Sequence, residues 1–147
     1  MIKKEKSQNL VNLNFWINRL ILKQGKLSKS SFIMDKIYFL LIKNFKEDPF
    51  IILNEAIENV SPVFLIKNKR IGKRVITQPF FIISDINRRF IGLKWLIKAA
   101  LKRKGDFYEN FILEISDAFN NKGSVKKKLN DLNLNVIENR FNLKYRW

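Results

Sequence analysis

Cysteine and histidine are both absent from this 147-residue chain. Their absence excludes disulfides, a thiolate nucleophile, an imidazole base and any zinc site built from cysteine or histidine. Catalysis would have to depend on carboxylates or lysines. We therefore expect a protein that is not an enzyme and that holds no cofactor and no metal.

Acidic residues are scarce: 13 Asp and Glu stand against 29 Lys and Arg, which gives a net charge of +16. Charge of this size attracts polyanions, so nucleic acid is the expected partner. Hydrophobic residues make up 46% of the chain, enough for a buried core. The sequence predicts a single nucleic-acid-binding domain over residues 1–147, with a polar tail at residues 1–12.

Long apolar runs are absent as well. Stretches such as Phe80–Ile83 are much shorter than the roughly 20 residues of a spanning helix, so we expect no membrane partner. The segment Met1–Lys6 is basic, but no apolar signal core follows it. If the protein works in an organelle, we expect it to be made there.

The carboxylates leave open one alternative, a metal-dependent RNA-processing enzyme. Its acidic residues would be Glu55 with Glu58, or Glu114 with Asp117. Helix capping explains other acidic residues, because Asp48 precedes a proline and Asp106 stands three residues before a glutamate. We favour the capping interpretation.

Apolar residues at helical spacing predict a mainly α fold, a six-helix bundle. Glycine, proline and aspartate set the expected limits. The predicted helices run from about Leu13 to Gly25, from Ser28 through Leu41, from Asp48 to before Pro62, from Asp85 to Lys102, from Asp106 to Gly123, and from Ser124 through Phe141.

The apolar stripes of these helices predict the core. In the second helix we expect Phe32 or Ile33 to be buried, and in the fourth Ile86 and Leu101. Further core predictions are Ile37, Leu40, Leu41, Ile52, Leu53, Ala56, Ile57, Val60, Phe90, Leu93, Ile97, Ala100, Phe111, Ile115, Ala118 and Phe119. The outer face of the third helix is acidic and should point away from phosphates.

Between the third and fourth helices the period changes to that of strands. Residues 63–66 and 75–77 are rich in β-formers, and Asn68 and Gly72 suit a turn, so residues 63–83 are predicted to form a protruding two-stranded β-hairpin. Pro79 argues against a third strand. The tip, Lys67–Arg74, carries five cations and no acid, which favours a nucleic-acid finger over a solvated loop. The ribbon also argues against a DNA-binding or membrane-surface helical protein.

Two helices carry cationic faces. In the fourth, Arg88, Lys94, Lys98 and Lys102 share one side, which Arg89 extends. Trp95 flanks this side and is interpreted as a core residue more than as a base-stacking platform. The sixth helix opens with three lysines, Lys126–Lys128, where unpaired N–H groups already carry partial positive charge, so an anionic partner is expected.

Several short motifs, in this order, resemble the small-subunit ribosomal protein S-seven family. They are Glu55–Val60, Pro62, Lys69–Gly72, Gln78-Pro79, Arg88-Arg89, Lys94–Ile97, Lys102-Arg103, Ser116–Ala118, Asn121–Gly123, Val125–Lys127 and Tyr145–Trp147. The similarity extends from about Leu13 to the last residue. Each motif is weak alone, but their agreement is specific.

The resemblance implies a structural constituent of the small ribosomal subunit that binds the 3′ major (head) domain of its rRNA and helps to nucleate head assembly. It places the ribbon near the E-site tRNA and the exiting mRNA, and the C-terminal part near the S-eleven family protein. The candidate RNA-binding residues are Lys67, Lys69, Arg70, Gly72, Lys73, Arg74, Arg88, Arg89, Lys94, Lys98, Lys102, Arg103, Lys122, Lys126, Lys127, Lys128, Arg140, Tyr145, Arg146 and Trp147.

The chain also departs from the family pattern. Lys73 follows Gly72 where two glycines are common, Lys128 stands where arginine is usual, and a basic N-terminal extension is largely missing. These shortened ends and the heavy use of Lys, Asn and Ile suggest a mitochondrially encoded form. A plastid-type organelle is the alternative.

Overall fold

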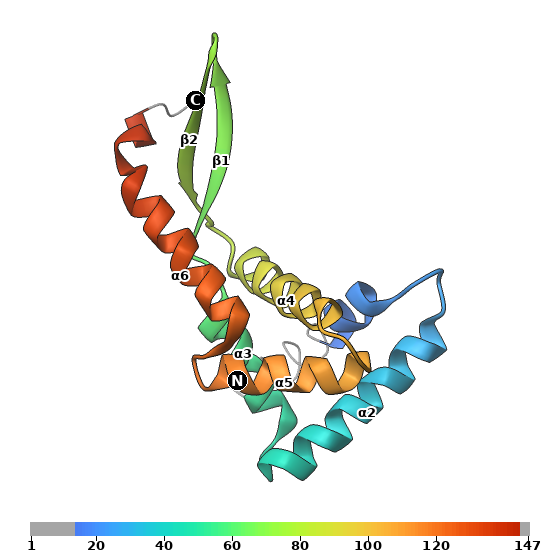
Figure 1. Ribbon diagram of the computed structural model, residues 1–147. Coiled ribbons are helices and arrows are strands. Elements are labelled where there is room, and N and C mark those ends of the chain that lie inside the picture. Colours follow the sequence, from blue (N-terminus) through green and yellow to red (C-terminus); the bar gives the residue numbers. More distant parts are fainter. Residues whose placement is uncertain (1–13, 145–147) are drawn as a thin grey trace, which may run out of the picture.

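The computed structural model describes residues 14–144 and shows a group of helices with a long β-ribbon projecting from it (Figure 1). A helix over residues 14–21 comes first. It is followed by α2 (Leu27–Phe45), α3 (Pro49–Val60), β1 (Phe64–Ile71), β2 (Arg74–Phe81), α4 (Asp85–Lys102), α5 (Phe107–Phe119), α6 (Gly123–Glu138) and the 3₁₀-helix η1 (Arg140–Lys144). Within residues 14–144, the predicted six helices and the hairpin between the third and fourth are confirmed.

The helix limits follow local chemistry. Asp48 caps α3, because its Oδ1 accepts a hydrogen bond from the Phe50 N–H at 3.1 Å, and Pro49 occupies the first turn. Lys46 ends α2 in the left-handed conformation, with a φ of 56°. The predicted capping role of the Asp106 side chain is wrong: its carboxylate accepts from the Tyr108 hydroxyl instead.

The core lies around α5, which packs against α2, α3, α4 and α6. All five core residues predicted in α3 are buried. The full set of predicted core residues that are buried is Ile37, Leu41, Ile52, Leu53, Ala56, Ile57, Val60, Leu93, Ile97, Ala100, Phe111, Ile115 and Ala118. Met34, Leu96 and Ile112 are buried in addition to the predicted set.

Other predicted core residues lie at the margin of this core. Ile33, Leu40 and Phe119 are partly buried and pack against it. Phe90 is also partly buried, and its ring lies edge-on to that of Trp16, with 5.0 Å between the ring centroids. The helix at residues 14–21 is therefore joined to α4 by an aromatic pair.

Two predicted core residues of α4 are exposed. Ile86 is 63% exposed and Leu101 54%, so these predictions are wrong. The first buried residue of α4 is Gly92, which leaves Ile86 in a turn that the other helices do not cover. Of the alternatives Phe32 and Ile33, Phe32 is the exposed one, at 59%. Such residues lie at the edges of apolar stripes, where a sequence pattern does not fix the boundary of burial.

The strands of the ribbon are longer than predicted. β1 and β2 pair antiparallel from Phe64 opposite Phe81 to Ile71 opposite Arg74, so only Gly72 and Lys73 form the turn. Gly72 has a φ of +61°, which suits glycine. Asn68 pairs with Thr77 inside the ladder, and its prediction as a turn former is wrong. Among residues 14–144 the sheet has two strands.

The ribbon is supported below its tip by the C-terminal elements. α6 lies beside β1 and η1 lies beside β2 (Figure 1), and the Asn142 side chain donates a hydrogen bond to the Thr77 carbonyl at 2.9 Å. The predicted continuation of the sixth helix through Phe141 is wrong, because α6 ends at Glu138. At this end the Asn139 side-chain amide donates a hydrogen bond to the Asn135 carbonyl. The side chain thereby competes with backbone N–H groups for a carbonyl of the helix.

Candidate nucleic-acid interface

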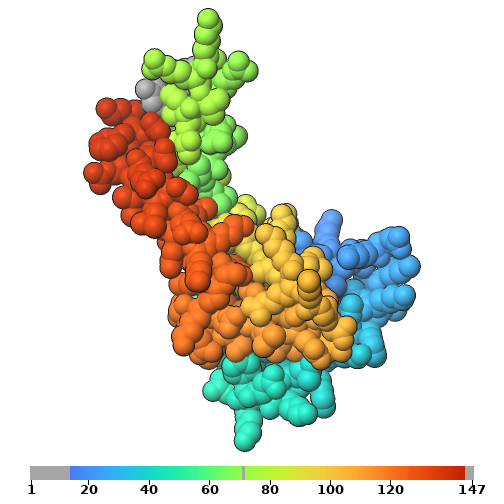
Figure 2. Space-filling model, viewed as in Figure 1, coloured from blue at the N-terminus to red at the C-terminus, as the bar shows by residue number. Residues whose placement is uncertain are grey.

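The distal half of the ribbon carries cations on both faces. Cross-strand partners share a face, so Lys67, Lys69 and Arg74 lie on one side and Arg70 on the other. No aspartate or glutamate occurs from residue 64 to residue 81. In the space-filling view α6 and η1 lie against the ribbon, and the tip of the ribbon projects beyond them (Figure 2). Its charge is therefore not neutralised by acids of the ribbon itself.

A second group of cations lies where α4 meets the start of α6. The Lys128 Nζ stands 4.3 Å from the centroid of the Trp95 ring. Partial burial, and then repulsion from Lys98 and Lys102, lowers the pKa of Lys128 below its ordinary value. A phosphate beside these three ammonium groups would relieve their repulsion.

These lysines line a cavity of about 450 Å³ between α4, α5 and α6. Glu114 also lines the cavity, but it is 2% exposed and accepts from the Arg103 Nε at 2.7 Å. The acid is thus already paired with a cation. Trp95 is partly buried against the core, which confirms its interpretation as a core residue.

Two of the predicted RNA-binding arginines are held by an acid of the protein. Arg88 and Arg89 each place an Nη2 atom 2.8 Å from a different oxygen of Glu58. Glu58, on the acidic side of α3, is therefore neutralised by the basic start of α4. The pair fixes the end of α3 against the start of α4.

Arg103 makes a similar pair at the other end of α4. Its guanidinium contacts Glu114 and, at 3.0 Å, Asp117. Partial desolvation opposes the charge, but these two carboxylates raise the pKa of Arg103 above its ordinary value. No group of three potential metal ligands occurs among residues 14–144. Three of the four carboxylates considered for an enzyme, Glu58, Glu114 and Asp117, are engaged in ion pairs with arginines.

The lysine run of α6 divides between internal and exposed roles. Lys126 donates to the Asn59 carbonyl at 2.9 Å and to the Asn121 side chain at 2.8 Å. The Asn59 amide in turn donates to the last carbonyls of α5. Lys126 therefore joins α3 to α6, which explains part of the run without an anion, whereas Lys127 is exposed.

The roles of Glu58 and Asn59 are not predicted from the sequence. Both residues lie within the Glu55–Val60 motif. The sequence signal that could have indicated their roles is that these two polar residues stand next to the apolar Val60 at the end of the third helix.

The remaining candidates are dispersed. Lys94 and Arg140 lie over the rings of Phe90 and Phe141, respectively. Lys122 is exposed and immediately precedes α6. The last three candidates, Tyr145, Arg146 and Trp147, lie outside the described residues.

The fold and this surface define a mainly helical structural protein with a projecting cationic ribbon. The model of the family "Ribosomal protein S7p/S5e" matches residues 2–136. The chain therefore belongs to the ribosomal protein S7p/S5e family. No helix within residues 14–144 has the length and apolar character needed to cross a membrane.

Bacterial relatives support the same assignment. The small ribosomal subunit protein uS7 of Dictyoglomus turgidum is 32% identical over 142 residues, which cover 95% of this chain and 88% of the relative. The uS7 protein of Pediococcus pentosaceus is 34% identical over 132 residues, covering 89% and 83%. The protein is thus a structural ribosomal protein of the small subunit, and the enzyme interpretation is not supported.

Proposed function

We propose that this protein binds the 3′ major (head) domain of small-subunit rRNA and helps to nucleate assembly of the head. The observation that carries the proposal is the division of its cations. Some are paired with the protein's own acids, whereas within residues 14–144 the ribbon and the lysines beside Trp95 have no acidic partner. Unpaired cations on a folded surface are suited to phosphates.

The proposed binding mode is recognition of backbone and shape. Phosphate contacts position a protein on RNA, and structured RNA is recognised largely by its shape. In this mode Arg88, Arg89, Arg103 and Lys126 maintain the geometry of the surface through their protein partners. The cations proposed to contact phosphates directly are Lys67, Lys69, Arg70, Lys73, Arg74, Lys98, Lys102, Lys127 and Lys128.

A salt titration with matched variants tests the proposal. Changing Lys98, Lys102 and Lys128 to glutamine should weaken rRNA binding and reduce the slope of log affinity against log salt by roughly 0.7–0.9 for each phosphate interaction removed. The matched control changes Lys23, Lys26 and Lys29 to glutamine. It removes the same charge from the other side of α4. Equal effects of both variants, or a flat salt dependence, would contradict the proposal.

We infer that the ribbon turn lies near the E-site tRNA and exiting mRNA, and that the C-terminal elements lie near the S-eleven family protein. The turn at Gly72 and Lys73 is exposed and far from the helices, which supports the inferred position of the ribbon turn (Figure 1). Because the chain lacks cysteine, Lys73→Cys provides one attachment point for a photoreactive group. Cross-links in translating ribosomes to tRNA or mRNA are expected, and cross-links confined to distant rRNA would contradict the placement.

We further infer a mitochondrial small subunit, with a plastid-type organelle as the alternative. Heavy use of Lys, Asn and Ile supports an AT-rich coding genome. The relatives named above are bacterial, so the inference depends on composition. Sedimentation of the protein with organellar small subunits is expected, and its recovery only in a bacterial-type cytoplasmic particle would contradict it.

A further inference from the structure

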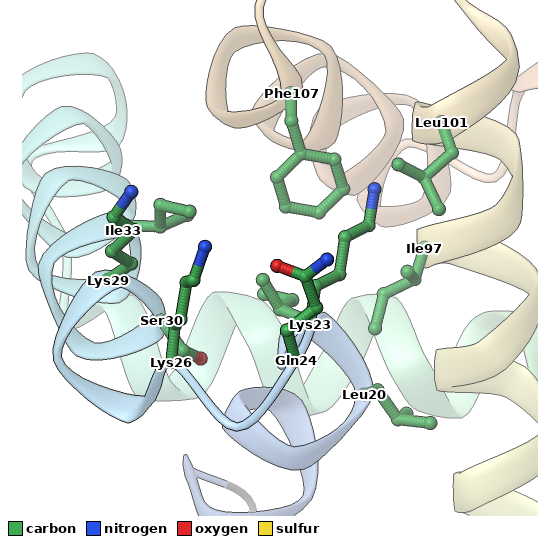
Figure 3. A pocket seen from close by; sticks show the side chains of 11 residues that line it. Leu20, Lys23, Gln24, Lys26, Lys29, Ser30, Ile33, Ile97, Leu101 and Phe107 are labelled. Atoms are coloured by element: carbon green, nitrogen blue, oxygen red, sulfur yellow. The ribbon is translucent and has the colours of Figure 1, made fainter.

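A second cavity, of about 360 Å³, lies on the other side of α4 from α6, between the helix at residues 14–21, α2, α4 and the start of α5 (Figures 1 and 3). Its walls are apolar. They include Leu20 and Ile33, Ile97 and Leu101 of α4, and Phe107 of α5. This volume suits one or two large side chains.

The rim of this cavity is cationic. Lys23, Lys26 and Lys29 line it, and Figure 3 shows their side chains around the apolar walls. No aspartate or glutamate is among the described residues that line it. The uncharged polar side chains of the lining are those of Ser30 and Gln24. The Ser30 hydroxyl already donates to the Asn18 carbonyl at 3.0 Å.

Apolar surface continues from the cavity along α2. A shallow groove is lined in part by Lys29, Phe32 and Ile33, of which Lys29 and Ile33 also line the cavity. Phe32 is 59% exposed, and the Lys36 Nζ lies 4.7 Å from its ring centroid. Exposed apolar patches with a polar rim are typical of docking surfaces.

The mostly aliphatic walls favour a protein side chain over a nucleobase. A base carries donors and acceptors on its edge, and burying them unpaired against Leu20 and Ile33 would be costly. The aromatic wall residue, Phe107, already stacks on Phe111, with 5.6 Å between the ring centroids. The chain's own residues 1–13 suit the site poorly, since their charges are mostly positive.

We propose that this cavity binds an acidic segment of another protein of the ribosomal particle, which inserts one large apolar side chain. Carboxylates beside that side chain pair with Lys23, Lys26 and Lys29, and a second apolar residue covers Phe32. The occupant is thus an acidic protein segment with apolar anchors. The inference rests on the proposed function, because the partner belongs to the assembled particle.

Photo-cross-linking from a single cysteine tests this proposal. Lys29→Cys, labelled with benzophenone and assembled into the small subunit, should cross-link to a protein peptide in which a large apolar residue is flanked by acids. The matched control is Lys127→Cys, which should cross-link to rRNA. Adding Leu101→Asn to the Lys29→Cys variant should lower the protein cross-link about tenfold, because it removes apolar contact.

The outcomes separate the two proposals. A cross-link from position 29 to rRNA, to a basic peptide, or to no partner overturns the docking site while the control still reaches rRNA. A control that fails to reach rRNA overturns the proposed function instead. An unchanged yield with Leu101→Asn also overturns the apolar anchor, because a purely electrostatic contact would not depend on that side chain.

Discussion

Among single residues, the acids decide which cations are available. Glu58 forms ion pairs with Arg88 and Arg89. Glu114 and Asp117 form ion pairs with Arg103. The sequence predicts that all three arginines face RNA, because a helical pattern does not show which acid packs across from it. The exposed lysines of the ribbon can be selected from the sequence, since no acid lies near them along the chain.

The Glu58 pair predicts a stability effect. Glu58→Gln should lower the free energy of unfolding by about 1 kcal/mol, discounted for the partial exposure of the pair. Urea denaturation measures the effect. Glu55→Gln, one turn earlier and exposed, changes charge equally and should change stability by less than about 0.5 kcal/mol. Equal effects of the two variants would contradict a structural role for Glu58.

The lowered pKa of Lys128 predicts a pH effect. Its charged form is disfavoured in the free folded protein, so folding stability should rise as pH rises from this lowered pKa towards the ordinary one. A bound phosphate favours the charged form, so rRNA affinity should fall over the same pH interval. Affinity measured against pH in the wild type and in Lys128→Met checks this, because the substitution should remove the early decline. The same decline in both proteins would refute it.

Among the helices and strands, strong local signals set the limits well. Asp48-Pro49 and Pro62 bracket α3, and the predicted limits of α4, Asp85 and Lys102, are those observed. The strands are predicted too short because their lysines resemble a loop, whereas α6 and η1 support a continuous ladder. That support is a tertiary contact, which local propensity does not contain.

The crossing of α3 and α4 depends on Gly92. A Cβ there would lie 2.9 Å from the Ser61 Oγ and 3.2 Å from its Cα. Gly92→Ala should therefore lower stability by about 1–3 kcal/mol, although alanine favours the helix by about 1 kcal/mol. Thermal unfolding measures the difference. Asn87→Ala, exposed on the same helix, should be neutral or stabilising, and stabilisation by Gly92→Ala would contradict the close approach.

The molecule as a whole has a helical body and a projecting arm, in which α6 and η1 lie against the cationic ribbon (Figure 2). The fold class and the family resemblance could be inferred from the sequence, because helical periods and several motifs agreed. The two cavities on either side of α4 could not, because each is lined by residues from several helices. Their different linings, lysines with Trp95 and aliphatic walls with a lysine rim, support different partners.

Lysine reactivity in the free protein and in the assembled small subunit is the sharpest test of which cations face RNA. Amine labelling read by mass spectrometry should show Lys98, Lys102 and Lys127 reactive when free, protected in the subunit, and reactive again after ribonuclease treatment. Lys126, which already donates to protein oxygens, should react weakly in every state. Equal labelling of the three lysines in free protein and subunit would contradict phosphate binding by this surface.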